Sequence, residues 1–574
     1  MAEISTTREP SSPPSGPPAA KKARLDDPPK VDVQGDAAPP PGNAKPPKKS
    51  KKQKFKDLPE ACSSEDVLWQ EIKDILGAEY VDTAVKEGTV RKSPFEQRQE
   101  LEVEVVAMSS SGTALATSSS ASRPWVVVVP FCVPGETARV RVYNNSRLHS
   151  VADLIEVITP NPTIRDDSLV ECKYFGTCGG CQYQMLSYEK QLELKRDVVV
   201  KAYTKFSDIP SSSMPPIEST MPSPLQYNYR TKITPHFNAP NKTQRSNPDN
   251  PQNDTDKPSW FNIGFNRVGT QKVIDIEDCP ISTPVIRAAL PAVRANAIAN
   301  LYTYKKGVSL ILRDSLPLST TNADIAENGE PKHICVTNHR GRVRERVGPN
   351  LFEYPASSFF QNNNCVMPSL VSYVRERIFD SAPSDTPTPT HLVDTYCGAG
   401  LFAISLASSF KIVAGIELSV ESIQAASINA KLNSLPPFPR PVGTSKDNVN
   451  RMITFQPGDA TQIFSVVSKF PASETVVVID PPRKGCDEPF IEQLVGFGAQ
   501  TVVYVSCNVH TQARDVGMIL RRDVGGKDGK AKGKYVLESV RGFDLFPQTA
   551  HVESVAVLRL VEGQTEGMDV DSAV

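Results

Sequence analysis

Apolar and polar residues alternate along residues 98–160 in the pattern of short β-strands. In "ELEVEVVAM" the apolar Leu101, Val103 and Val105 alternate with glutamates, and "PWVVVVPFCVPGETARVRVY" predicts a buried strand, a Pro-Gly turn and a second strand with Arg139 and Arg141 facing outward. Several short strands in so short a segment predict a small barrel of the OB type. Such barrels often bind oligonucleotides, which the arginines suit; a barrel with a purely structural role is the alternative.

From about residue 385 onward strand and helix patterns alternate, which predicts a parallel α/β sheet. "HLVDTYCGAGLFAISLASSF" predicts a strand, a tight turn at Gly398 and Gly400, and a helix whose free N–H groups suit a ligand. The next strand ends on Glu417, placed to bond ribose hydroxyls. Because Gly398, Gly400 and Ala403 fit the dinucleotide pattern G-x-G-x-x-A, an NAD-dependent oxidoreductase stays open at this point.

The following strand favours a different ligand. "ETVVVIDPPRKGC" runs from a buried strand into Asp480, and the two prolines after it make a rigid lip at the edge where ligands bind in open α/β sheets. A planar base could rest against this lip within hydrogen-bond reach of Asp480, whereas a dehydrogenase has no obvious use for it. An ordinary acidic loop at a strand end is the alternative.

A thiol ends the next predicted strand, "TVVYVSC", at the same edge of the sheet. Asn508 is placed to cap the following helix, and a helix N-terminus should lower the pKa of Cys507 and raise its thiolate fraction. An ordinary buried cysteine is the alternative. Position alone does not single out this thiol, because Cys397 and Cys486 also lie near the pocket.

Two candidate bases begin the last predicted strand, in "RGFDLFPQTAHVESVAVLRL". Glu553 and His551 are two residues apart and would share one side of the strand, although Glu553 could also be a surface carboxylate on an edge strand. A thiol and a base together suit methylation of uracil at C5. Addition of the thiolate at C6 makes C5 nucleophilic, and a base then removes the C5 proton so that the thiol can leave.

Six motifs occur in the order found in RNA 5-methyluridine methyltransferases: "SSFFQNN" (357–363), "DTYCGAG", "GIELS", "IDPPRKG", "VSCN" and "HVESVAVL". Over residues 100–560 the chain resembles this family, and most of all the fungal tRNA (uracil-5-)-methyltransferases that make ribothymidine in the T-loop. The resemblance implies a class I, Rossmann-like methyltransferase domain, a TRAM-like barrel, a mixed α+β central domain, S-adenosyl-L-methionine as methyl donor and tRNA as substrate. It implies Cys507 as nucleophile, Glu553 as base, and a cofactor pocket of Gln361, Tyr396, Glu417 and Asp480.

The resemblance leaves two other functions open. One is 5-methyluridine formation in ribosomal RNA, and the other is RNA binding or folding by a protein without catalysis. An intact Cys507 and Glu553 argue against the second, and the Asp-Pro-Pro-Arg lip argues against the oxidoreductase.

A cysteine array precedes the catalytic region. "ECKYFGTCGGCQYQ" has the spacing C-x5-C-x2-C, and Cys279 follows in "IEDCPI". Four thiolates could hold an iron–sulfur cluster or a zinc ion, with free thiols as the alternative. The spacing resembles the array that holds a four-iron, four-sulfur cluster in bacterial relatives acting on ribosomal RNA, and the expected ligands are Cys172, Cys178, Cys181 and Cys279.

The segment "QYNYRTKITPHF" (226–237) interleaves aromatic and cationic residues. Tyr227 and Tyr229 could stack on unpaired bases while Arg230 and Lys232 pair with phosphates; an ordinary strand is an equal alternative. A target base in a folded loop must leave its stack to reach Cys507.

Composition completes the domain organisation. Net charge is −1 in 574 residues, so global charge predicts no partner, and eleven cysteines without a secretory signal favour reduced thiols. There is no apolar run of membrane-spanning length, and no obligate protein partner is evident. Basic clusters at 21–25 and 45–56 could serve nuclear import or attract RNA, with a solvated tail as the alternative. The expected location is the nucleus, the cytoplasm or both, with a mitochondrial pool left open. The predicted parts are a disordered basic, Pro-rich tail (1–65), the barrel (95–160), a central RNA-binding domain (170–350), the methyltransferase domain (351–562) and a disordered tail (563–574).

Overall fold

The computed structural model describes residues 58–245, 257–381, 387–435, 452–458, 463–525 and 531–562, all within one compact unit, Lys56–Val574. The C-terminal tail, most of the N-terminal tail, its basic clusters and most of three low-complexity loops (238–258, 436–450 and 525–534) lie outside these residues. None of the described helices combines the length and apolarity needed to cross a membrane.

Two helices that the sequence analysis did not predict precede the barrel, α1 (Ser64–Leu76) and α2 (Ala78–Lys86). The first begins inside the predicted tail, because Ser63 accepts a hydrogen bond from the Asp66 N–H and so caps the helix. Trp69 and Ile72 of α1 and Val81 of α2 join the hydrophobic core of the barrel.

Five strands close into the predicted barrel, in the order β1-β2-β3-β5-β4. The alternating run forms β1 as expected, with Leu101, Val103 and Val105 buried and the glutamates between them exposed. The strands are β1 (Glu100–Met108), β2 (Ala114–Thr117), β3 (Val126–Val129), β4 (Thr137–Asn145) and β5 (His149–Thr159).

The central region is mixed α+β, as predicted, and consists of small sheets rather than one large one. Its elements are α3 (Tyr188–Phe206), β6 (Glu218–Met221), β7 (Lys232–Ile233), β8 (His236–Phe237), α4 (Lys242–Arg245), β9 (Gly264–Asn266), β10 (Val273–Asp275), α5 (Pro284–Ala299), β11 (Val308–Ser309), β12 (Leu312–Ser315), α6 (Asn322–Asn328), β13 (Ile334–Val336), β14 (Arg342–Val347) and β15 (Asn350–Pro355). Short 3-10 helices lie at Asp167–Leu169, Ser211–Ser213, Leu301–Thr303, Asn364–Val366, Ala407–Ser409 and Ala472–Glu474.

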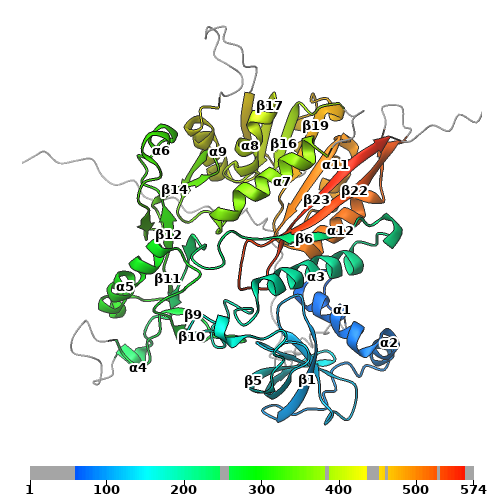
Figure 1. Ribbon diagram of the computed structural model, residues 1–574, viewed down its shortest axis with the longest axis vertical. Helices are drawn as coiled ribbons and strands as arrows, with labels where there is room; N and C mark the ends of the chain where they lie inside the picture. Colours follow the sequence, from blue (N-terminus) through cyan, green and yellow to red (C-terminus); the bar gives the residue numbers. More distant parts are fainter. Residues whose placement is uncertain are drawn as a thin grey trace, which may run out of the picture. The chain divides into compact units, whose positions relative to one another are not determined.

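The C-terminal half forms one large sheet with strand order β18-β17-β16-β19-β20-β23-β22-β21 (Figure 1). The strands from β18 to β20 are parallel to one another, and β23 and β22 follow in antiparallel pairing. The elements are α7 (Met367–Phe379), β16 (His391–Thr395), α8 (Leu401–Leu406), β17 (Ile412–Glu417), α9 (Val420–Leu432), β18 (Met452–Pro457), α10 (Ile463–Val466), β19 (Thr475–Ile479), α11 (Glu488–Phe497), β20 (Thr501–Ser506), α12 (Val509–Leu520), β21 (Asp523–Gly525), β22 (Ala531–Phe543) and β23 (Glu553–Glu562).

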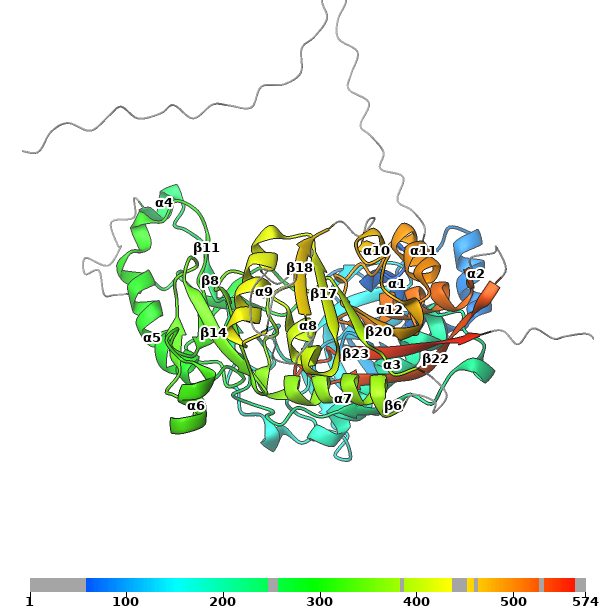
Figure 2. The ribbon, with the colours of Figure 1, turned by 90° about the horizontal axis from the view of Figure 1, so that it is seen from above.

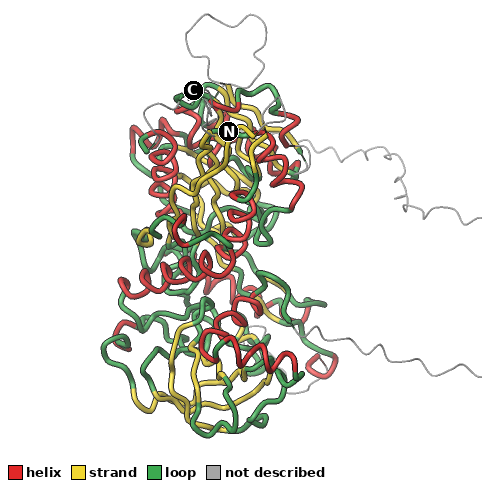
Figure 3. Tube along the Cα trace, turned by 90° about the vertical axis from the view of Figure 1, so that its right-hand side faces the viewer, coloured by secondary structure: helices red, strands yellow, loops and turns green. Residues whose placement is uncertain are grey.

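Helices cover both faces of this sheet, as Figures 2 and 3 show. One hydrophobic core joins the sheet to α7, α8 and α9, and a second joins its other face to α3, α10, α11 and α12. The parallel strands therefore carry apolar residues on both faces, which explains their unbroken valine runs. The predicted Rossmann-like fold is confirmed.

The large sheet also recruits residues from the region predicted to be a separate central domain. Strand β6 pairs in parallel with β22, and α3 packs on α12 and β6. The catalytic sheet is thus completed by a segment that lies far upstream of the predicted boundary at residue 351.

Candidate active site

The carboxyl ends of the parallel strands meet at one edge of the sheet and open into a cavity of about 700 Å³. Tyr396 follows β16, Glu417 ends β17, Asp480 follows β19 and Cys507 follows β20; all four line this cavity together with Gln361. The structure thus brings together the four predicted cofactor residues and the predicted nucleophile.

The glycine turn after β16 shapes the floor of the cavity. Gly398 and Gly400 have positive φ values of 53° and 90°, and the Gly398 N–H donates to Glu417 Oε2 at 3.2 Å. A Cβ on Gly398 would meet no atom within 4 Å, so its backbone faces open space. Tyr396 also has a positive φ, 60°, a conformation that costs a non-glycine residue energy and is concentrated at functional sites.

Asp394, the last residue but one of β16, offers an unused acceptor to this cavity. Its Oδ2 accepts a hydrogen bond from the Ala403 N–H at 2.8 Å, whereas its buried Oδ1 has no hydrogen-bond partner in the described structure. Burial raises the pKa of Asp394 to about 8 and that of Asp480 to about 7. These carboxyl groups would be stabilised as anions by an incoming cation.

These residues fit S-adenosyl-L-methionine, a cation that carries an ammonium group and a ribose diol. Glu417 would accept hydrogen bonds from the ribose hydroxyls, and the free oxygen of Asp394 suits the ammonium group. Asp394 was not among the predicted site residues, although an acid near the end of a strand and before a glycine turn could have suggested a role.

The nucleophile lies where the sequence predicted, but its ionisation differs. Asn508 caps α12 by accepting a hydrogen bond from the His510 N–H at 3.2 Å. The expected lowering of the Cys507 pKa is nevertheless wrong: burial, Glu553 and Asp480 raise it to about 11, against the lowering effect of Arg483. Desolvation and two nearby carboxylates outweigh the helix N-terminus.

The predicted base lies next to the nucleophile. Strands β20 and β23 pair antiparallel, with Ser506 opposite Ser554; Cys507 is the residue after Ser506 and Glu553 the residue before Ser554, and the charge of Glu553 acts on the Cys507 thiol. Glu553 is only 3% exposed on a strand inside the sheet, so it is not a surface carboxylate on an edge strand. Burial raises its pKa to about 8, with a further rise from Asp480 and a lowering by Arg483.

The other candidate base, His551, and the other candidate thiols, Cys397 and Cys486, suit these roles less well. Burial lowers the pKa of His551 to about 4, and its ring packs edge-on against Phe546 at 4.9 Å between ring centroids. Cys397 lines the cavity but is almost fully buried, and Cys486 donates to the Tyr504 hydroxyl; burial raises the pKa of both thiols.

Phe359 and Leu418 at the cavity were missed by the sequence analysis. Their exposed fractions are 75% and 74%, unusual for large apolar side chains. The two adjacent phenylalanines before Gln361 were the sequence signal that could have indicated an apolar wall of the cavity at Phe359.

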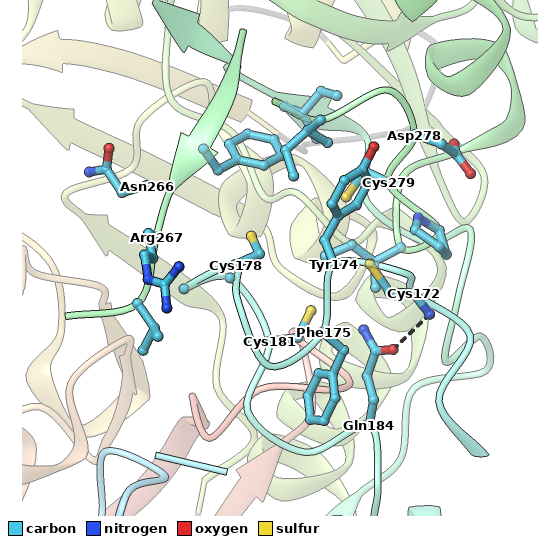
Figure 4. Close-up of a pocket in the computed structure, with 18 of the residues that line it drawn as sticks. Cys172, Tyr174, Phe175, Cys178, Cys181, Gln184, Asn266, Arg267, Asp278 and Cys279 are labelled. Carbon is cyan, nitrogen blue, oxygen red and sulfur yellow. Dashed lines mark hydrogen bonds between the residues drawn. The ribbon is translucent and has the colours of Figure 1, made fainter. Parts of the chain in front are cut away.

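The four cysteines of the array line a second cavity of about 560 Å³ (Figure 4). Gln184 accepts a hydrogen bond from the Cys172 N–H at 3.1 Å, and burial raises the pKa of Cys178 to about 11 and of Cys181 to about 12. In the part of the chain that the structure describes, no group of three or more His, Cys, Asp or Glu side chains could hold a metal ion. A zinc site is therefore not supported.

The structure does not favour two of the RNA contacts expected from the sequence, base stacking by Tyr229 and phosphate binding by Arg139 and Arg141. Tyr229 is buried and donates to the Pro547 carbonyl at 3.0 Å, so it cannot stack on a base; it lies before the short strand β7 rather than in a strand. Arg139 and Arg141 face outward but form ion pairs with Glu156 and Glu100, so a phosphate would have to displace a carboxylate.

Comparisons with known proteins agree with this geometry. The family model described as tRNA (Uracil-5-)-methyltransferase matches residues 332–561. The tRNA (uracil(54)-C(5))-methyltransferase of Schizosaccharomyces pombe is 40% identical over 515 residues, covering 90% of this chain and 86% of that protein. The enzyme with the same description in Saccharomyces cerevisiae is 34% identical over 496 residues, covering 81% and 74%.

A solved structure shares the fold. The Pyrococcus abyssi tRNA (uracil-54, C5)-methyltransferase, crystallised with S-adenosyl-L-homocysteine, aligns with a TM-score of 0.52 at 20% identity. The alignment covers 80% of this chain and 100% of that chain.

Proposed function

Because the chain belongs to the tRNA (uracil-5-)-methyltransferase family, we propose that it methylates C5 of uridine 54 in tRNA. The methyl donor is S-adenosyl-L-methionine. The observation that carries this proposal is that Cys507 follows β20 where the paired strand β23 begins with Glu553, and that Cys507 lines the cavity of Gln361, Asp394, Glu417 and Asp480. A nucleophile, a base and an acidic cofactor pocket then meet at one edge of the sheet.

Cys507 and Glu553 divide the chemistry between them. Cys507 Sγ bonds to C6 of the uracil ring, and the electron pair of the C5–C6 double bond makes C5 nucleophilic. The bound donor supplies the methyl group that C5 takes up. Glu553 then removes the C5 proton; the electron pair of that C–H bond restores the double bond as the C6–S bond breaks and the thiolate leaves.

The nucleophile must be generated during the reaction. With a pKa of about 11, Cys507 is a thiol at neutral pH in the free protein, and its proton has to leave as the bond to C6 forms. Asp480 and Glu553 are the carboxyl groups that act electrostatically on this thiol, and Arg483 favours the thiolate.

Fluorine at C5 cannot leave as a proton, so 5-fluorouracil-containing tRNA tests the proposal. Mass spectrometry of protein, this tRNA and S-adenosyl-L-methionine should show a covalent adduct that carries the methyl group and maps to Cys507. Cys507→Ala should abolish the adduct, whereas Cys335→Ala, at a half-buried thiol in another part of the chain, should retain it. If tRNA binds but no adduct forms, the protein is better described as a non-catalytic RNA-binding protein. If an adduct forms only with 5-fluorouracil-containing ribosomal RNA fragments, the substrate is ribosomal RNA rather than tRNA.

The cysteine cavity supports a second, separate proposal, that a four-iron, four-sulfur cluster is held by Cys172, Cys178, Cys181 and Cys279. Its support is that four thiols from two segments line one cavity, and four cysteine thiolates are the usual ligands of such a cluster. Methyl transfer takes no step through this group. Anaerobic reconstitution with iron and sulfide should give cluster absorption that Cys181→Ser removes and Cys335→Ser leaves; absence of absorption would favour free thiols.

A further inference from the structure

The loop between β22 and β23 leads directly into the base, Glu553, and a buried ion pair holds its start. Lys195 of α3 pairs with Asp544, and both side chains are fully buried. Lys195 Nζ also donates to the Phe546 carbonyl at 2.9 Å, and Asp544 Oδ1 accepts from the Phe546 N–H at 3.1 Å. One lysine thus fixes both the side chain and the backbone of this loop.

Two more side chains of α3 hold the same loop. Gln191 accepts from the Gln548 N–H at 2.9 Å and donates through Nε2 to Gln548 Oε1 at 3.1 Å. The Tyr188 hydroxyl donates to Asp544 Oδ2 at 3.0 Å. Residues 188, 191 and 195 are spaced i, i+3 and i+7, so they form one stripe along the helix. We call these three residues the α3 stripe.

The α3 stripe is polar, although burial of apolar side chains at these positions would cost less desolvation free energy. A buried ion pair is a weak source of stability, because desolvation of the two charges offsets their attraction. What such a pair does supply is a defined geometry, because each charge tolerates few alternative positions. The stripe is therefore better explained by the position it imposes than by the stability it adds.

The position of Asp544 affects the base, Glu553, through the pairing of β22 with β23. Phe543 pairs with Glu553 across β22 and β23, and Asp544 follows Phe543 directly. Fixing Asp544 therefore fixes the backbone that lies beside Glu553. On its other side β23 pairs with β20, whose last residue, Ser506, lies opposite Ser554 and is followed by Cys507.

We propose that Lys195, through its ion pair with Asp544, is a positioning residue that sets Glu553 against C5 of the uridine. This inference rests on the proposed function, in which Glu553 is the base. A misplacement of the base by about 1 Å is enough to slow proton removal by up to a hundredfold, while attack by Cys507 and methyl transfer are left intact. Loss of the pair should therefore stall the reaction after methyl transfer.

The test follows the base step by itself in the full-length protein. Transfer RNA with tritium at C5 of its uridines reports proton removal, and radiolabelled S-adenosyl-L-methionine reports the methylated covalent adduct after denaturation. In Lys195→Met, tritium release should slow by about tenfold or more, and the methylated adduct should accumulate on ordinary tRNA, as in Glu553→Gln. Arg165→Met is the matched control, because it breaks another buried ion pair, with Glu136 of the barrel, and should not cause the adduct to accumulate.

Two further variants separate positioning from folding. Lys195→Met combined with Asp544→Asn leaves no unpaired buried charge and should fold, yet still accumulate the adduct. Tyr188→Phe removes a single hydroxyl from the α3 stripe and should slow tritium release by a smaller factor. Wild-type tritium release in both variants would overturn the inference. If the wild-type protein forms no methylated adduct with 5-fluorouracil-containing tRNA, or if Glu553→Gln accumulates none on ordinary tRNA, the proposed function fails instead.

Discussion

Cys507 directly follows β20, and Glu553 is the first residue of β23, the antiparallel partner of β20; the last pair between these strands is Ser506 with Ser554. The charge of Glu553 acts on the Cys507 thiol, and the two groups are assigned to adjacent atoms of one ring, C6 and C5. Neighbouring strands thus bring the nucleophile and the base together. The sheet register, rather than a flexible loop, sets their spacing.

Removal of the base should convert the enzyme into a trap for its substrate. Glu553→Gln is expected to lower turnover by about 10²–10⁴-fold, because removal of the C5 proton loses its general base while Cys507 and the methyl donor are unchanged. A methylated covalent complex with ordinary tRNA should appear on denaturing gels. Glu492→Gln, an exposed acid on α11, should behave as wild type. Equal turnover in the two variants would remove Glu553 from the mechanism.

The cofactor pocket should depend on the acid at the end of β17. Glu417→Ala is expected to weaken S-adenosyl-L-homocysteine binding by about tenfold or more, because hydrogen bonds to charged groups contribute about 1.5–3 kcal/mol. Isothermal titration calorimetry measures the change. Glu421→Ala, at an exposed position in the first turn of α9, is the control, and a loss of equal size there would contradict the assignment.

Stability should fall as the pH rises through the range in which Glu553 ionises. The folded-state pKa of about 8 lies above the ordinary value of 4.5, so the folded protein binds more protons than the unfolded chain between these two values. The free energy of unfolding then decreases with pH, by up to about 1.4 kcal/mol per pH unit, and the decrease ends above the folded pKa.

Urea unfolding across this pH range compares the wild type with Glu553→Gln. The variant lacks the titrating group, so its stability should decline less steeply. Buried Asp394 and Asp480 add the same trend to both proteins, and the difference between the two curves isolates Glu553. Parallel curves would show that Glu553 keeps an ordinary pKa.

A buried arginine should stabilise the segment that carries Gln361. Arg313 on β12 is fully buried, lies 3.6 Å from the Glu345 carboxylate and donates to the Ser358 carbonyl at 2.9 Å. Arg313→Met leaves Glu345 buried without its cation, which should cost about 3–5 kcal/mol of unfolding free energy. Arg340→Met, at an exposed position, should change urea unfolding little, and similar losses in both variants would refute the prediction.

The parts of the fold that local patterns describe were predictable. Alternation of period two specified β1 and the barrel, and apolar runs followed by Gly398 or Pro481 specified the strands and the ligand edge of the large sheet. The central strands, several of them two to four residues long, are too short for periodicity to reveal. The pairing of β6 with β22 is a long-range contact without a local pattern.

The sequence was enough to predict which residues form the active site, but not the pKa of its nucleophile. Motif order brought Cys507 and Glu553 into one site, whereas their registry across two strands and their burial came from the folded structure. The pKa of Cys507 was predicted in the wrong direction because a local feature, the helix N-terminus, was weighed without the surrounding desolvation. The free oxygen of Asp394 and the α3 stripe likewise depend on contacts between distant segments.

Strand β6 also constrains how the protein can be made. Its hydrogen bond from Arg541 Nε to the Ser219 carbonyl joins residues 322 positions apart, so β6 leaves the ribosome long before its partner strand exists. At about 5–20 residues per second, the segment waits tens of seconds for β22. Synthesis must be nearly complete before β6 can pair, and a chain truncated before β23 also lacks Glu553. For the same reason, the methyltransferase region cut at residue 351 would lack a strand and a covering helix, and cannot be exchanged between proteins as an independent module.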